Sequence, residues 1–279
     1  MKSIKINDAS IVFVGGGKMG EAIIGGWIDS RQGSANLIGA AGISVVEVND
    51  DRKDHLGKTF GVRCVGSAEE ISEADVVVLA VKPQAMMDAL TALRALPVFE
   101  KSLFISIAAG LTTARLVEAL PQNSRLIRVM PNTPLLVGQG ASAVCASSTS
   151  TDEDLSLVLD LFDCLGQAVI VEESAMDVVT ALSGSGPAYV AAMLESLTRA
   201  AVGEGLDAEL AERLAIQTAL GTMILISETG QSPQTVRESV SSPGGTTLAA
   251  LAAMSKAGMD KLYCDGVSAA VNRSKELGA

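Results

Sequence analysis

The sequence contains almost no histidine and very few aromatic residues. Its 279 residues include one histidine, His55, and Phe, Trp and Tyr together make up 3% of the chain. A Ser-His-Asp mechanism would depend on that one imidazole, and a zinc site would need ligands that this chain does not cluster. Hydrolases of the triad type and zinc enzymes are therefore disfavoured, and we expect no metal site.

The cysteines are few, widely spaced and form no Cys-x-x-Cys pair. They are Cys64, Cys145, Cys164 and Cys264. Cysteines paired at short spacing are typical of redox-active or metal-binding motifs, and this chain contains no such motif. The sequence therefore predicts buried or inert thiols at these positions.

A basic charge balance and long apolar runs are also missing. The formal net charge is −11 at pH 7, and no charge-free stretch of 18 apolar residues occurs. The acidity disfavours nucleic acid and anionic membranes as partners, and the short apolar runs disfavour a membrane span. We expect a cytoplasmic protein with a small-molecule substrate. That substrate can itself be an anion, because backbone N–H groups bind anions locally.

Hydrophobic residues are abundant, at 48% of the chain, and up to about residue 172 they predict strands that alternate with helices. The predicted strands are Ile11–Val14, Ile43–Val48, Val76–Val81, Leu103–Ala108, Leu126–Met130, Ala141–Ala146 and Ala168–Val171. This alternation is typical of a doubly wound, mostly parallel α/β sheet. We predict a Rossmann-type dinucleotide-binding domain in residues 1–172, with the order of its last strands left open.

Beyond residue 172 the strand pattern ends and helices dominate. Helices are predicted from Pro187 to about Val202 and from the cap Asp207 to about Glu228, with others after Pro233 and Gly245. Small apolar residues occupy more than one face of these helices, so the helices need more burial than a small domain can supply. The sequence predicts an all-α dimerisation domain in residues 173–279 and a homodimer.

A glycine fingerprint, Gly15-x-Gly17-x-x-Gly20, follows the first predicted strand and opens a helix. Gly15 allows the tight turn, Gly17 lets a pyrophosphate approach the backbone, and Gly20 lets helix and strand pack closely. The phosphates would lie at the N-terminus of the helix. The spacing alone is weak, since glycine turns also join strands to helices for structural reasons, but its position favours a dinucleotide site.

Two further predicted strands end at the same edge of the sheet, where ligands of open α/β sheets gather. Ala80–Pro83 closes one of them and Ala108–Gly110 closes the next. The residues that we expect to bind the cofactor are Gly15, Gly16, Gly17, Lys18, Met19, Gly20, Asn49, Ser67, Ala80, Val81, Lys82, Pro83, Ala108, Ala109 and Gly110.

The end of the second strand would meet the adenosine ribose, and its charges are mixed. An acid there favours the free 2′-hydroxyl of NADH, and a cation favours the 2′-phosphate of NADPH. The acids Glu47, Asp50 and Asp51 compete with Asn49, Arg52 and Lys53. We expect NADPH, and use of NADH as well is left open.

Two loops in the helical part carry an unusual density of Ser, Gly and Pro. Ser183–Pro187 precedes one predicted helix and Ser241–Thr247 precedes another. Pro187 and a threonine cap can simply start helices. The second loop, however, places helix N-terminal N–H groups beside two hydroxyls, which is an arrangement that binds a carboxylate.

With these motifs the chain resembles the pyrroline-5-carboxylate reductase family. The matching stretches follow the family's order and cover nearly the whole chain: Val14–Gly20, Ala80–Pro83, Ala108–Gly110, Met130–Pro134, Ser183–Tyr189 and Ser241–Thr247. The acidic segment 47–51 departs from the family, whose members often carry Ser, Pro or Thr there. That departure puts the cofactor preference in doubt, but not the reaction class.

The resemblance implies reduction of 1-pyrroline-5-carboxylate to L-proline, the last step of proline biosynthesis. It implies that Ser242, Gly245 and Thr246 hold the substrate carboxylate, that Thr247 hydrogen-bonds the ring nitrogen, and that Glu173 lies near the substrate. It also implies intertwined dimers that can assemble into decamers, with active sites shared between subunits. Activity on the six-membered homologue and inhibition by proline are left open.

Two functions other than imine reduction are compatible with this architecture. Hydroxyacid or ketoacid dehydrogenases need a proton donor for the alkoxide, commonly Lys or His, and residues 173–255 contain neither. A cyclic imine can arrive protonated at nitrogen, so the missing donor favours the imine. A nucleotide-binding sensor without activity would explain the fingerprint but not the carboxylate-ready loop. Fold alone does not separate these alternatives.

Overall fold

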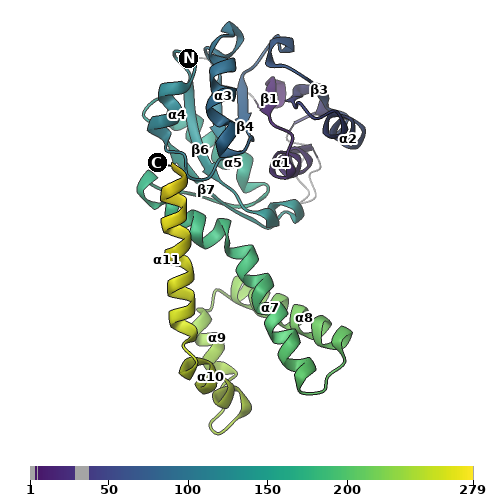
Figure 1. The fold of residues 1–279 in the computed structure, drawn as a ribbon, viewed down its shortest axis with the longest axis vertical. Helices are drawn as coiled ribbons and strands as arrows, with labels where there is room; N and C mark the ends of the chain where they lie inside the picture. Colours follow the sequence, from purple (N-terminus) through teal and green to yellow (C-terminus); the bar gives the residue numbers. More distant parts are fainter. Residues whose placement is uncertain (1–3, 5, 29–37, 279) are drawn as a thin grey trace. The chain divides into compact units, whose positions relative to one another are not determined.

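The computed structural model describes residues 4, 6–28 and 38–278 of the chain (Figure 1). Its strands are β1 (Ile11–Val14), β2 (Ile43–Val46), β3 (Arg63–Val65), β4 (Val76–Leu79), β5 (Leu103–Ser106), β6 (Arg125–Met130), β7 (Gly140–Ala146) and β8 (Gly166–Ile170). The helices between them are α1 (Lys18–Ile28), α2 (Asp50–Phe60), α3 (Pro83–Arg94), α4 (Thr113–Ala119) and α5 (Asp152–Asp163).

The strands form one sheet in the order β3-β2-β1-β4-β5-β6-β7-β8. Every neighbouring pair is parallel except β6 and β7, which are antiparallel. The short connection 131–139 between those two strands contains only the 3₁₀ turn η5 (Thr133–Val137), whereas a parallel crossover needs a dozen or more residues. The expected Rossmann-type, mostly parallel sheet is confirmed.

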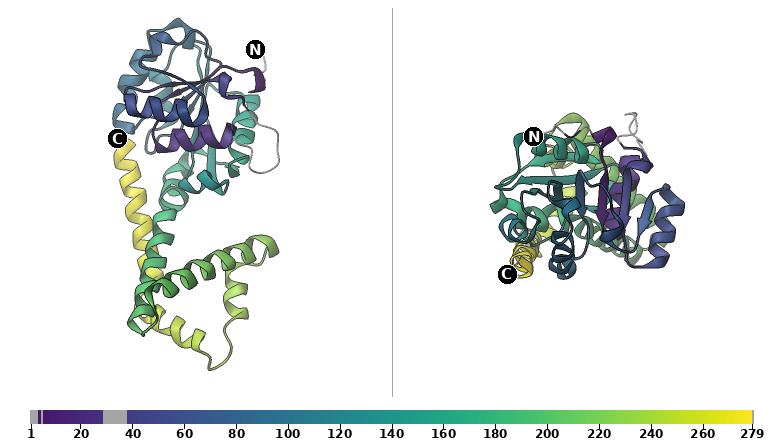
Figure 2. Two further views of the ribbon diagram at one scale, coloured as in Figure 1. Left: turned by 90° about the vertical axis from the view of Figure 1, so that its right-hand side faces the viewer. Right: turned by 90° about the horizontal axis from the view of Figure 1, so that it is seen from above.

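The sheet is buried on both faces, which explains the continuous apolar runs of its central strands. Ile11 and Phe13 of β1 pack with α1 and α5, whereas Val12 and Val14 pack with α3 and α4. Seen along the sheet, helices lie on both of its sides (Figure 2). On the first face the buried Trp27 donates its indole N–H to the carbonyl of Leu161 at 2.7 Å. The sheet is thereby held as a rigid platform for its loops.

Each predicted strand is present, and most end earlier than the apolar runs do. β2 stops at Val46 because Asn49 already caps α2, accepting a hydrogen bond from the backbone N–H of Arg52 at 3.0 Å. β4 and β5 likewise stop two residues before the predicted ends, where the chain turns into the loops of the sheet edge. β3 was not predicted, because its three residues are too short for a strand pattern.

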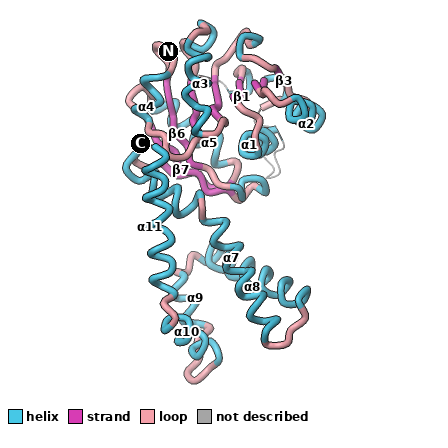
Figure 3. The backbone as a smooth tube through the Cα atoms, in the orientation of Figure 1, coloured by secondary structure: helices cyan, strands magenta, loops and turns pink. Residues whose placement is uncertain are grey.

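After β8 the described residues form helices joined by loops and no further strand (Figure 3). These helices are α6 (Met176–Val179), α7 (Gly186–Gly203), α8 (Ala208–Thr229), α9 (Pro233–Ser239), α10 (Thr246–Lys256) and α11 (Met259–Gly278). α7 and α8 match the predicted helices, and the Asp207 carboxylate caps α8 by accepting from the N–H of Leu210 at 3.1 Å. The all-α C-terminal part is confirmed.

The predicted loop at Ser183–Pro187 is wrong, because this segment is helical. Thr180–Gly184 forms a π-turn that leads into α7, closed by a hydrogen bond of 2.9 Å from Ser185 N–H to the Thr180 carbonyl. The Ser183 hydroxyl donates to the carbonyl of Val179, four residues before it. A serine whose side chain bonds back along its own turn is compatible with a helix, so its presence does not indicate a loop.

The described residues divide into two compact units, 1–185 with 270–279 and 186–269. The domain boundary predicted at 172 stays a prediction, and its first domain includes residues 1–3, 5 and 29–37, which lie outside the described part. The end of α11 belongs to the first unit. There the Ser274 hydroxyl donates to Asp177 at 2.6 Å, and Arg115 donates to the carbonyl of Gly278 at 3.0 Å.

The second unit exposes large apolar side chains along its helices. They include Leu210, Leu214, Leu220, Met223, Ile224 and Leu225 of α8. Among the described residues, α8 is the one helix that is long and apolar enough to cross a membrane. The mean hydropathy of its most apolar 18-residue stretch is 1.2, and 6% of that stretch is buried. Helices with apolar residues on several faces need a covering partner.

Candidate functional site

The glycine turn after β1 has the geometry that a dinucleotide fingerprint requires. Gly15 has φ +99°, and a Cβ on it would lie 2.9 Å from the carbonyl carbon and oxygen of Ala80. A Cβ on Gly20 would lie 3.0 Å from the Gly15 carbonyl oxygen. Both positions therefore require glycine for protein packing, the first for its backbone and the second for the close approach of α1.

Gly17 differs from its two neighbours in the fingerprint. A Cβ at this position would meet no protein atom within 4 Å. Packing therefore gives no reason for glycine here, and the open space lies directly before the N-terminus of α1, which begins at Lys18. Free backbone N–H groups at a helix N-terminus attract phosphate. The predicted pyrophosphate site at this turn is compatible with this geometry and stays a prediction.

The turn lies where the strand order reverses. From β1 the chain runs outward to β2 and β3, then returns to β4 on the other side of β1. In open α/β sheets the crevice at such a reversal, beyond the carboxyl ends of the strands, is the ligand site. The contact of Gly15 with Ala80 joins the two loops that border this crevice. The predicted cofactor residues 15–20 and 80–83 are thus brought together.

Glu47, directly after β2, reaches into the glycine turn. One of its carboxylate oxygens accepts a hydrogen bond from the N–H of Gly16 at 2.8 Å, and the other accepts from the N–H of Asn49 at 3.0 Å. A Cβ on Gly16 would lie 3.1 Å from that carboxylate and 2.6 Å from a methyl of Leu56. Gly16 therefore allows Glu47 to approach the turn.

Arg52 of α2 holds the other side of the same turn. Its guanidinium donates through Nε and Nη2 to the carbonyl of Gly16, the first at 3.0 Å, and forms an ion pair with Glu21 at 2.8 Å. His55 lies 2.7 Å from the other oxygen of Glu21. Burial alone would raise the pKa of Glu21, but the hydrogen bonds from His55 and Arg52 outweigh it and lower that pKa. These contacts tie α1, α2 and the glycine turn together.

The other predicted cofactor residues lie in different settings. Lys82 is the N-cap of α3 with Pro83 in its first turn, and Asn49 and Ser67 follow β2 and β3 at the carboxyl edge. Ala108 is buried. Gly110 has φ +83°, and a Cβ on it would lie 2.9 Å from the Cβ of Leu277. Gly110 thus packs against the end of α11.

A partly buried ion pair joins β6 to the segment after β8. Arg128 of β6, 2% exposed, donates to the carboxylate of Glu173. The N–H of Thr113, which starts α4, lies 3.4 Å from both oxygens of Glu173. Burial, with the nearby Glu173 carboxylate, raises the pKa of the Cys145 thiol to about 11. The Cys145 thiol is therefore neutral at physiological pH.

The predicted carboxylate loop is formed in the second unit. Gly245 is the N-cap of α10 and no side chain caps that helix. The Gly245 N–H donates to the carbonyl of Ser242 at 3.0 Å, and a Cβ on Gly245 would lie 2.6 Å from the Ser242 hydroxyl oxygen. Thr246 and Thr247 form the first turn of α10. The loop therefore combines uncapped N–H groups with the hydroxyls of Ser242, Thr246 and Thr247.

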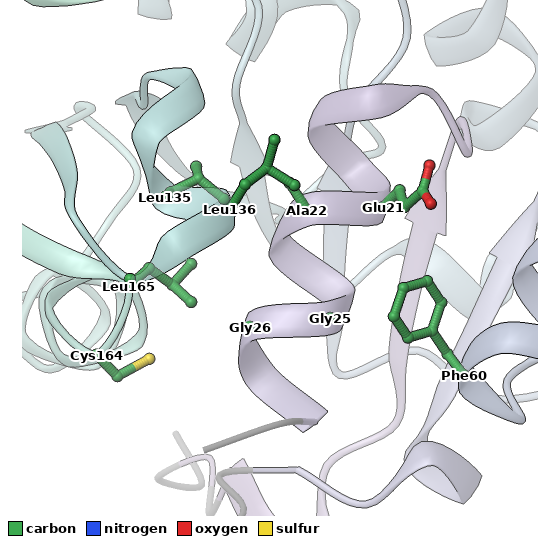
Figure 4. A pocket seen from close by; sticks show the side chains of 10 residues that line it. Glu21, Ala22, Gly25, Gly26, Phe60, Leu135, Leu136, Cys164 and Leu165 are labelled. Atoms are coloured by element: carbon green, nitrogen blue, oxygen red, sulfur yellow. The ribbon is translucent and has the colours of Figure 1, made fainter. Parts of the chain in front are cut away.

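A small apolar pocket lies further along α1 (Figure 4). Gly25 and Gly26 form its floor, with Leu135 and Leu165 on one side of the helix and Phe60 on the other. Its volume is about 170 Å³, below the roughly 300–1,000 Å³ of typical small-molecule sites. We assign it no ligand. Within the described residues, no group of three or more His, Cys, Asp or Glu is placed to hold a metal ion.

The sequence does not predict two arginine contacts near the site. Arg128 stands in the apolar run of β6, and a charged residue inside a buried strand is unusual enough to have marked it. Its Nε and one terminal nitrogen have no hydrogen-bond partner among the described residues. The sequence offers Arg52 as a phosphate ligand, whereas its contact with the Gly16 carbonyl depends on the fold and has no sequence signal.

Comparisons with known proteins agree with this geometry. The family model described as pyrroline-5-carboxylate reductase dimerisation matches residues 173–277, and the one described as NADP oxidoreductase, coenzyme F420-dependent, matches residues 10–110. A pyrroline-5-carboxylate reductase of Methanosarcina acetivorans is 38% identical over 98% of this chain and 99% of its own. One from Arabidopsis thaliana is 40% identical over 95% of this chain and 94% of its own.

Solved structures give the same result over the full length. A pyrroline-5-carboxylate reductase from Coxiella burnetii superposes with a TM-score of 0.87 at 36% identity, covering 98% of this chain and 100% of that chain. The pyrroline carboxylate reductase of Plasmodium falciparum, solved with NADP bound, superposes with a TM-score of 0.86 at 30% identity over the same shares.

Proposed function

The chain belongs to the pyrroline-5-carboxylate reductase family, and we propose which of its residues bind the cofactor and which bind the substrate. It is an NAD(P)H-dependent oxidoreductase that reduces the C=N bond of 1-pyrroline-5-carboxylate to give L-proline. The family and the reaction expected from the sequence motifs are thereby confirmed. The roles of individual residues that follow are proposals.

The glycine turn and the strand ends beside it hold the dinucleotide. Gly17 leaves open space before the N-terminus of α1, so Gly15 to Gly20 would bind the pyrophosphate through backbone N–H groups. Ala80 to Pro83 and Ala108 to Gly110 would line its nicotinamide half. When bound, the dinucleotide supplies the hydride that the imine carbon receives. A relative with NADP bound supports this use of the fold.

The loop before α10 holds the substrate. Ser242, Gly245 and Thr246 would bind its carboxylate through hydroxyls and the uncapped N–H groups of α10. A carboxylate fixed there orients the ring, and the Thr247 hydroxyl would then hydrogen-bond the ring nitrogen. Orienting a reactant in this way supplies much of an enzyme's rate. Residues 173–255 contain no Lys or His, which suits an imine that is protonated before it binds.

The subunits would associate through the helical part. The family model that matches residues 173–277 is named for dimerisation, and α8 exposes apolar side chains on several faces. A second copy of the chain would cover them, so we assign the apolar surface of α8 to a homodimer and not to a membrane. Higher assemblies such as a decamer, and a cytoplasmic location, are compatible with this assignment.

The open space at Gly17 is the strongest support for the proposed cofactor site. A Gly17→Ala variant would place a methyl where no protein atom lies within 4 Å. It should fold normally, yet it should weaken dinucleotide binding by about tenfold or more, because the methyl keeps the pyrophosphate from the backbone. The thermal midpoint and the dissociation constant for the cofactor are the two measurements. Unchanged cofactor binding in the folded variant would contradict the proposed site.

A further inference from the structure

We propose that Glu47 makes this enzyme select NADH over NADPH. The inference rests on the proposed dinucleotide site and names the residue that distinguishes its two cofactors. It departs from the NADPH expected from the sequence. The starting observation is the position of Glu47, one residue after the end of β2, with its carboxylate held in the glycine turn.

The carboxylate of Glu47 is fixed but not saturated. Gly16 N–H and Asn49 N–H donate to its two oxygens at 2.8 and 3.0 Å. An ionised carboxylate has about four acceptor positions, so about two remain for other donors. The edge of the sheet after the second strand is where the adenosine ribose lies in this fold. The two adjacent hydroxyls of an unphosphorylated ribose are donors that match the remaining acceptors.

A 2′-phosphate would meet the opposite situation at the same place. It offers acceptors and no donors, and it carries −1.5 to −2 charges near neutral pH. The fixed carboxylate cannot turn away without giving up the hydrogen bonds from Gly16 and Asn49. Like charges held in contact are unfavourable. Glu47 therefore favours the free ribose hydroxyls of NADH and disfavours the 2′-phosphate of NADPH.

The cations beside Glu47 are already engaged. Arg52 is bound to the Gly16 carbonyl and to Glu21, the latter at 2.8 Å. Lys53 forms an ion pair with Asp50 at 2.7 Å. Either side chain would have to leave its present partners to reach a phosphate. Arg52 and Lys53 are thus both paired within the chain, and the Glu47 carboxylate faces the turn.

The backbone donors after β3 are engaged as well. The carboxylate of Glu70 accepts from the N–H groups of Gly66 and Ser67 at 3.0 and 3.1 Å. Successive backbone N–H groups of this kind often bind phosphate. Here an acid of the chain itself occupies them. Ser67, expected among the cofactor residues, therefore offers little to a 2′-phosphate, because its N–H is bound to Glu70 and its hydroxyl accepts from Glu69 N–H.

The test compares NADH and NADPH on the purified enzyme, on Glu47→Gln and on Asp51→Asn. Dissociation constants come from nicotinamide fluorescence without substrate, and kcat/KM from turnover of pyrroline-5-carboxylate. Asp51→Asn removes the same charge from the first turn of α2 without touching the Gly16 contact. We expect the wild type to favour NADH by about tenfold or more in both measurements, as a charged hydrogen bond exchanged for a repulsion implies.

Glu47→Gln should bring the two cofactors to within about threefold of each other, by weakening NADH and strengthening NADPH. Asp51→Asn should keep the wild-type ratio. If the wild type binds NADPH as tightly as NADH or more tightly, the proposal is overturned, whether or not Glu47→Gln folds. It is also overturned if Asp51→Asn shifts the ratio as much as Glu47→Gln does. Failure of a folded wild type to bind either cofactor would instead overturn the dinucleotide site itself.

Discussion

Arg128 and Glu173 form a partly buried ion pair across 45 residues of sequence, joining the middle of β6 to the segment that follows β8. The Arg128 side chain is 3% exposed, whereas the Glu173 side chain is 34% exposed. A cation buried to this degree depends on its partner, because losing that partner leaves the charge uncompensated. Glu173 therefore has a structural role in addition to the expected position near the substrate.

Replacement of Glu173 by Gln should lower the free energy of unfolding. The loss of one partner of a buried pair costs about 3–5 kcal/mol, and the partial exposure of Glu173 reduces the expected loss to about 1–3 kcal/mol. Urea unfolding measures it. Glu172→Gln, at the exposed neighbouring position, is the matched control. A double-mutant cycle with Arg128→Met that gives no coupling would contradict the interpretation.

Gly110→Ala should destabilise the first unit. Alanine at φ +83° is strained, and its methyl would lie 2.9 Å from the Cβ of Leu277, so the expected loss is about 1–3 kcal/mol. Gly57→Ala is the control, because Gly57 lies within α2 and its Cβ would have only an ordinary contact, 3.7 Å from the Val62 carbonyl. That variant should gain about 0.5–1 kcal/mol. Equal thermal midpoints for the two variants would count against the packing of α11 on Gly110.

Thr247→Ala should reduce kcat by about tenfold to a hundredfold, which is the range expected for loss of one hydrogen bond to a reacting group. Cofactor binding should be unchanged, because Thr247 lies on α10 and has no proposed contact with the dinucleotide. Thr247→Ser keeps the hydroxyl and should recover most of the rate. Wild-type turnover in Thr247→Ala would remove Thr247 from the proposed mechanism.

The contribution of Glu21 to stability should depend on pH. Its pKa is lowered below the ordinary 4.5, since His55 and Arg52 outweigh the effect of burial. A carboxyl whose pKa is lower in the folded state stabilises the fold above its unfolded pKa, and that stabilisation is lost as pH falls through the folded pKa. Glu21→Gln should therefore be less stable than the wild type at neutral pH.

The difference between Glu21→Gln and the wild type should shrink as the pH falls below 4.5. Urea unfolding at a series of pH values measures it, with the exposed Glu100→Gln as control. A difference that stays constant from neutral to acidic pH would show that the contacts of Glu21 do not depend on its charge.

Much of the fold and of the glycine site could be predicted from the sequence, because these features are local. The first strand and the Gly15-x-Gly17-x-x-Gly20 turn after it can both be recognised in the residues themselves. Glycine is needed at particular positions of such a turn, so its spacing is a direct signal. The caps of α2 and α8 are equally local, since Asn49 and Asp207 each bond an N–H three residues on.

The remainder depended on contacts between distant segments. Which charges of the segment 47–53 are paired within the chain could not be read from its sequence, because Arg52 pairs with Glu21 of another helix. The segment around Ser183 has the composition of a loop but forms a helical turn. Hydrogen bonds from Ser183 and Ser185 to carbonyls of the preceding turn stabilise that conformation. The burial of Arg128 likewise follows from sheet order.

Oxidation of NADH and NADPH by the purified enzyme with pyrroline-5-carboxylate, with a 2-keto acid as the control substrate, measures the activity and the cofactor preference together. We expect rapid oxidation with the imine alone, and faster turnover with NADH than with NADPH. Oxidation with the keto acid in place of the imine, or none with either substrate from a protein that binds the dinucleotide, would contradict this expectation.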